Sequence, residues 1–158
     1  MKTKLILLYL LIGFYSLNSS SQTDENFNSD GTFTVPAGVF DITIEAWGGG
    51  GAGGISFLIS SGSEQSGGGG SGAFSKSTLS VTPGEEYFIV VGNGANDSQT
   101  PDPGEDSWFG PDNNISNAEV LAKGGMSVGG TNTTSGAAGG LAINGIGDET
   151  VDGNDGTD

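Results

Sequence analysis

Two short runs made almost entirely of glycine constrain this chain more than any other feature of its sequence. Six of the seven residues in 48–54 are glycine, and so are five of the six in 67–72. Glycine loses more backbone freedom on ordering than any other residue, so such runs fold only where backbones can pack closely. We therefore expect structural roles for Gly48, Gly49, Gly50, Gly51, Gly53, Gly54, Gly67, Gly68, Gly69, Gly70 and Gly72.

The residues between the glycine runs have the pattern of β-strands. In 40–47, apolar residues alternate with Asp41, Thr43, Glu45 and Trp47, which is the period of a half-buried strand. Further strands are predicted near 32–35, 73–81, 87–91, 107–110 and 119–122. The sequence of residues 82–85, Thr-Pro-Gly-Glu, predicts a type II turn, and we expect the strands at 32–35 and 40–47 to be antiparallel neighbours. These patterns predict an all-β domain.

The first 21 residues have the features of a secretory signal peptide. Lys2 and Lys4 precede an apolar stretch at 5–15, which is too short for a membrane span and is followed by small polar residues. We expect a signal helix cleaved after Ser21, a secreted or cell-surface protein and no membrane insertion after cleavage. The alternative is an uncleaved N-terminal anchor.

Charge and cysteine content narrow the class of partner. The formal net charge is −15, the chain has only four lysines or arginines, and it has no cysteine. Phosphate backbones and anionic lipid surfaces would repel such a chain, so nucleic acid is excluded as a partner. An exported domain without disulfides indicates a bacterial rather than an animal protein.

We divide the chain into four parts. Residues 1–21 are the signal peptide, 22–30 a disordered lead-in, 31–147 a glycine-rich β domain and 148–158 a disordered acidic tail. The alternative is low-complexity disorder throughout, because 31 of the 158 residues are glycine. The clean alternation of the intervening strands argues against that alternative.

The chain lacks the usual catalytic and cofactor-binding patterns. It contains no histidine or cysteine, and neither glycine run has the form of a phosphate-binding loop. We expect no catalytic residue, no cofactor and no enzymatic activity. A pair of carboxylates could hydrolyse glycosides in principle, but nothing places two of the candidates across a cleft: Glu45, Glu85, Glu86, Glu105 and Asp106.

Acidic residues near the C-terminus raise the question of calcium. They are joined by glycines, and calcium prefers oxygen ligands, but their spacing does not match an EF-hand loop. We favour a solvated tail without metal, with calcium as the alternative, for Asp148, Glu149, Asp152, Asp155 and Asp158.

Aromatic residues are the candidates for a binding surface. Trp47 is predicted to point away from the apolar face of its strand, Phe57 lies in an apolar insert and Trp108 lies beside an acidic loop. Tryptophan stacks on sugar rings and anchors protein interfaces, so we select Trp47, Phe57 and Trp108. The alternative is that both tryptophans are buried.

The order of motifs resembles the glycine-rich domain of secreted proteins of the Bacteroidetes and of phage tail fibres, and more distantly the glycine-rich region of the anaplastic lymphoma kinase receptor. The resemblance is carried by residues 33–39, 45–51, 67–70, 73–76, 79–84, 87–94, 107–110 and 122–125. It implies a jelly-roll-like β-sandwich bearing polyglycine II segments, with binding by the segments 55–66 and 93–106. Such domains usually continue further, so we expect the glycine-rich domain to be C-terminally incomplete.

These observations favour a non-catalytic, exported glycine-rich domain for adhesion or cell-surface binding and assembly, with a cell-surface glycan or protein as its ligand. The alternative is a structural spacer in a larger surface protein. Ice binding by a flat polyglycine surface and glycoside hydrolysis are weaker alternatives.

Overall fold

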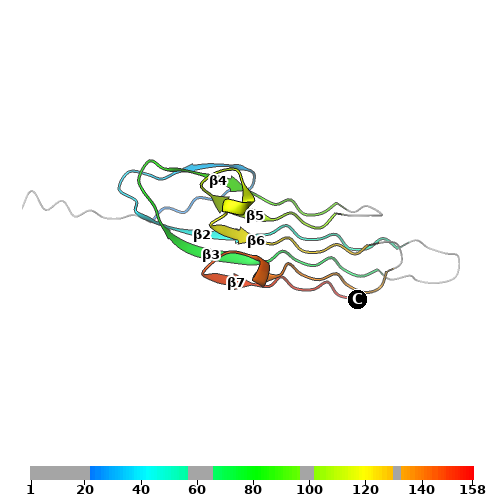
Figure 1. The fold of residues 1–158 in the computed structure, drawn as a ribbon. Helices are drawn as coiled ribbons and strands as arrows, with labels where there is room; N and C mark the ends of the chain where they lie inside the picture. The colour runs from blue at the N-terminus through cyan, green and yellow to red at the C-terminus, as the bar shows by residue number, and fades with distance from the viewer. Residues whose placement is uncertain (1–21, 57–65, 97–101, 130–132) are drawn as a thin grey trace, which may run out of the picture.

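The computed structural model describes residues 22–56, 66–96, 102–129 and 133–158, and these residues form an all-β fold (Figure 1). The predicted signal peptide and Phe57 lie outside the described residues. None of the helices in the described part is long and apolar enough to cross a bilayer. The elements are β1 Gly31–Thr34, β2 Asp41–Trp47, β3 Phe74–Ser80, β4 Glu86–Val90, β5 Ser107–Gly110, β6 Val120–Ala122 and β7 Glu149–Val151, with 3₁₀ helices η1 Ile115–Asn117 and η2 Ala142–Asn144.

The strands form two antiparallel sheets that face each other as a sandwich. One sheet has the order β1-β4-β5-β6 and the other the order β2-β3-β7. The predicted sandwich is therefore confirmed, but the prediction that the first two strands are neighbours is wrong. β1 pairs with β4 and β2 pairs with β3, because the turn at 36–39 carries the chain from one sheet to the other.

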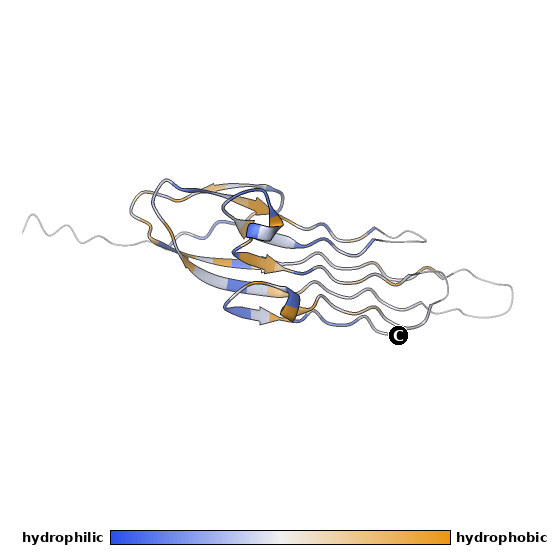
Figure 2. Ribbon diagram, viewed as in Figure 1, coloured by the Kyte–Doolittle hydropathy of each residue, from blue (hydrophilic) through white to orange (hydrophobic). Residues whose placement is uncertain are grey.

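The core lies between the two sheets, and Figure 2 shows the apolar residues concentrated there. Its buried residues are Val35, Val81, Tyr87, Phe109 and Val120. The inner face of β2 packs Ile42, Ile44 and Ala46 against them, as the alternation predicts. Phe40 was expected on this face but is 62% exposed, since it precedes the first residue of the strand.

Two buried serines on the inner face of β3 make hydrogen bonds at one side of the sandwich. Ser75 is fully buried on β3 and donates a 2.6 Å hydrogen bond to the carbonyl oxygen of Leu121 on β6 in the other sheet. Ser77, two residues along the same face, accepts a 2.9 Å bond from the amide of Asp148. Hydroxyl groups on the inner face of β3 thus bind β6 in the other sheet and the residue that precedes β7.

Beyond the sandwich, seven nearly straight segments run side by side along the axis of the strands (Figure 1). We number these glycine segments in chain order: segment 1 is 48–56, segment 2 is 66–73, segment 3 is 91–96, segment 4 is 102–106, segment 5 is 123–129, segment 6 is 133–140 and segment 7 is 152–158. Together they form what we call the glycine bundle. It carries few apolar side chains, as the pale ribbon in Figure 2 shows.

Both ends of the described chain are more ordered than expected. The residues 148–158, expected to be a disordered tail, instead contain β7, which pairs with β3, and segment 7 of the glycine bundle. In the lead-in 22–30, which has no strand or helix, the Asp30 carboxylate accepts a 2.8 Å bond from the amide of Val91. Backbone and carboxylate hydrogen bonds therefore fix residues that have little apolar surface to bury.

Candidate functional site

In the glycine segments the pattern of exposed and buried residues repeats every three residues, rather than every two as in a strand. Along segment 1, the exposed positions are Gly50, Gly53 and Ser56, and the buried ones are Gly49 and Ala52. Trp47, the last residue of β2, continues the exposed series by one step. A left-handed helix with three residues per turn has this period and makes no internal hydrogen bonds, so its amides must bind neighbouring segments.

Hydrogen bonds between segments have the same period. Segment 1 donates to segment 2 at every third residue, over 2.8–3.0 Å, from Gly48 to Ala73, from Gly51 to Gly70 and from Gly54 to Gly67. Segment 5 donates to segment 1 in parallel, from Gly125 to Gly49 and from Val128 to Ala52. Each segment is thus bonded to several neighbours at once, which is the arrangement of polyglycine II. The predicted conformation of the glycine runs is confirmed.

Most glycines of the bundle are required because a neighbouring backbone lies too close for a side chain, and not because of their φ and ψ angles. Among the described glycines only Gly38 and Gly84 have a positive φ, and Gly84 occupies the predicted type II turn. A Cβ at Gly51, however, would overlap the carbonyl oxygen of Met126, and one at Gly72 would overlap that of Gly48. By contrast, the nearest atom to a Cβ at Gly50 would be 3.8 Å away.

The space available for a Cβ differs among the eleven glycines selected from the sequence. A Cβ would overlap a side chain, that of Ser66, at Gly54, and it would overlap backbone atoms at seven others: Gly48, Gly49, Gly51, Gly67, Gly69, Gly70 and Gly72. At Gly53 and Gly68 the nearest backbone atom would be 3.3 Å away, and Gly50 faces open space. The interior of the bundle therefore consists mostly of bare main chain, together with the small buried side chains of Ala52, Ala73 and Val128.

Side-chain oxygens complete the pattern where a direct backbone bond is missing. The amide of Ala52 donates to Ser127 Oγ at 2.8 Å, and this hydroxyl donates in turn to the carbonyl oxygen of Asp102 at 2.7 Å. The hydroxyl of Ser127 thus links segments 1, 4 and 5.

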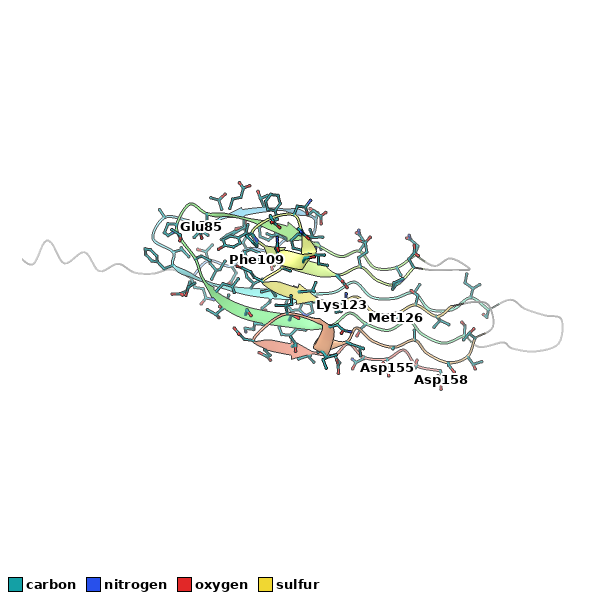
Figure 3. All side chains as sticks on the ribbon, in the orientation of Figure 1. Glu85, Phe109, Lys123, Met126, Asp155 and Asp158 are labelled. Atoms are coloured by element: carbon teal, nitrogen blue, oxygen red, sulfur yellow. The ribbon has the colours of Figure 1, made fainter. Side chains whose placement is uncertain are left out.

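Segment 7 uses aspartate carboxylates in the same way. Asp152, Asp155 and Asp158 accept bonds of 2.6 Å, 2.9 Å and 2.9 Å from backbone amides on the preceding part of the chain, those of Ala142, Gly139 and Gly136 respectively. Figure 3 shows the last two carboxylates on segment 7. We call these three residues the aspartate ladder. Their oxygens serve the backbone, and no group of three acidic, histidine or cysteine residues in the described part is placed to hold a metal ion.

Four of the five carboxylates considered for catalysis are likewise engaged, and the fifth, Glu86, is exposed on β4. Glu85 accepts from the amide of Thr82 and from the hydroxyl of Tyr87, Glu105 accepts from Asn93, and Asp106 binds both Lys123 and the amide of Gly124. Glu45 pairs with Lys76 at 2.8 Å. The hydrogen bond to Glu45, together with the charge of that carboxylate, raises the pKa of Lys76.

The outer face of the β2-β3-β7 sheet carries two aromatic side chains in contact, one of them largely exposed. Trp47 is 61% exposed and lies against Phe74, with ring centroids 5.1 Å apart and ring planes at 47°. Val151 of β7 stands opposite Phe74 and is 50% exposed. We call Trp47, Phe74 and Val151 the aromatic row. It crosses all three strands where the sheet meets the glycine bundle.

Of the two selected residues that the structure describes, Trp47 is exposed and Trp108 is buried. Trp108 is 6% exposed and lies in β5, whose four residues are all buried, so its ring cannot contact a ligand. Phe57 lies outside the described residues. Sequence reasoning missed Phe74 and Val151, although the alternation of 73–81 indicates that Phe74 points to the same face as Lys76.

Fold and bundle together define a class of protein: an all-β sandwich whose strands continue into hydrogen-bonded polyglycine II segments. A family model described as a glycine-rich domain matches residues 25–158, and the chain belongs to this family. Comparison with curated proteins and with solved structures gave no match.

Proposed function

We propose that the protein is an exported, non-catalytic glycine-rich domain that serves adhesion or assembly at a cell surface. The observation that carries this proposal is the aromatic row. An apolar patch that includes a largely exposed tryptophan is typical of a surface that contacts a partner.

The glycine bundle supports the proposal because it makes the base of this row stiff. Segment 1 begins directly after Trp47 of β2, and segment 2 ends directly before Phe74 of β3. The two segments are hydrogen-bonded to each other at every third residue. A side chain held on a rigid scaffold loses little conformational entropy on binding. The arrangement therefore suits recognition better than flexible linkage.

The proposal is tested by replacing Trp47 with alanine. We expect binding of the purified domain to its target cell surface to fall roughly thirtyfold or more, since truncation of a tryptophan anchor commonly costs about 2 kcal/mol or more in binding. Thermal unfolding should change little, because the ring is largely exposed. Binding is measured by flow cytometry with labelled protein.

Phe40→Ala is the matched control, since Phe40 is 62% exposed and lies at the opposite end of β2. Equal binding by the wild type and both variants would contradict the assignment of the row. Absence of binding to any cell surface would favour a structural spacer instead.

A further inference from the structure

The aromatic row is bordered by a surplus of negative charge. In the next row of the same face, Lys76 lies between Glu45 and Glu149 on the flanking strands. Further along, Asp41 accepts a 2.9 Å bond from Ser80, and Asp148 accepts a 3.3 Å bond from the amide of Thr78. This face thus presents four carboxylates and one ammonium group.

The described surface offers little to an anionic partner. Its two lysines, Lys76 and Lys123, are both paired with carboxylates, those of Glu45 and Asp106. The whole chain has a formal net charge of −15. Charge therefore excludes phosphate groups and acidic glycans and favours a cationic ligand.

We infer that the aromatic row binds a protein segment bearing arginine or lysine side chains. Arginine stacks on the faces of aromatic rings and pairs with carboxylates, and the row places Trp47 and Phe74 beside Glu45 and Glu149. The apolar part of these long side chains would cover Val151. This inference rests on the proposed function and specifies the chemistry of its partner.

The inference is tested with hexa-arginine and hexa-lysine peptides as probes, against a hexa-glutamate peptide and an uncharged cello-oligosaccharide. Affinity of the full-length exported protein is measured by calorimetry at low and at physiological salt. We expect the arginine peptide to bind best, with affinity that decreases as salt increases. Trp47→Ala and Glu149→Gln should each weaken binding, the former roughly tenfold.

Phe40→Ala and Asp112→Asn are the matched controls, because they remove an exposed ring before β2 and an exposed carboxylate that follows β5 of the other sheet. If these variants weaken binding as much as Trp47→Ala and Glu149→Gln, the attraction is nonspecific and the inference fails. Absence of binding by the cationic peptides also overturns it. If Trp47→Ala reduces cell binding while only the cello-oligosaccharide binds, the proposed function survives and the cationic partner is wrong.

Discussion

Gly51 and Gly50 are neighbours in segment 1, yet the structure has room for a side chain at Gly50 and none at Gly51. A Cβ on Gly51 would overlap the carbonyl oxygen of Met126, whereas a Cβ on Gly50 would have no atom closer than 3.8 Å. Neither residue has a positive φ, so alanine can adopt both backbone conformations. The pair therefore separates the packing role of glycine from its conformational role.

We predict that Gly51→Ala destabilises the domain and that Gly50→Ala does not. The first should lower the free energy of unfolding by about 2 kcal/mol or more, since the backbones must move apart. The second should raise it by about 0.5 kcal/mol, because alanine restricts the unfolded chain. Urea unfolding followed by tryptophan fluorescence measures both. Equal effects of the two substitutions would disprove tight packing in the bundle.

Segment 7 shows how an element without apolar residues is held in place. Each residue of the aspartate ladder lies three positions from the next, so all three carboxylates face the same row of amides. Gly139, whose amide binds Asp155, is itself buried. Loss of the Asp155 carboxylate would leave this buried amide without a hydrogen-bond acceptor. The desolvation penalty of such an unpaired amide exceeds the net free energy that an ordinary hydrogen bond contributes.

We predict that Asp155→Ala lowers the free energy of unfolding by about 1–2 kcal/mol and accelerates hydrogen exchange at the Gly139 amide. Asp155→Asn retains an oxygen acceptor and should have a smaller effect. Hydrogen exchange measured by NMR resolves the individual amide. An unchanged exchange rate in Asp155→Ala would show that the ladder contributes nothing to the attachment of segment 7.

The elements themselves could largely be predicted from the sequence, but their partners could not. Alternation places the inner face of β2 correctly, and proline and glycine at 83 and 84 locate a turn. Strand pairing depends on contacts between distant residues, which is why β1 and β2 were wrongly placed together.

Segment 7 was missed because acidic residues suggested solvation, although Asp152, Asp155 and Asp158 repeat the three-residue period that its glycines also follow. Trp108 could not be told from an exposed tryptophan without knowing that β5 is an inner strand.

At the scale of the whole molecule, the predicted signal peptide determines whether the protein is exported. The predicted signal peptide lies outside the described residues, and the family match begins at residue 25. We predict that export removes residues 1–21. Intact-mass analysis of the protein from the culture medium should give a species that begins at Gln22. A secreted protein that retains Met1 would contradict cleavage, and one found only inside the cell would contradict export.

The network of the bundle has a kinetic consequence. Amides at 68 and 71 donate to carbonyl oxygens at 157 and 154, which lie 89 and 83 residues further along the chain. Contacts between such distant residues slow folding, because a long loop must close before they form. The bonds between segments 2 and 7 can therefore form only after segment 7 has been synthesised, which makes completion of the bundle a late step in folding.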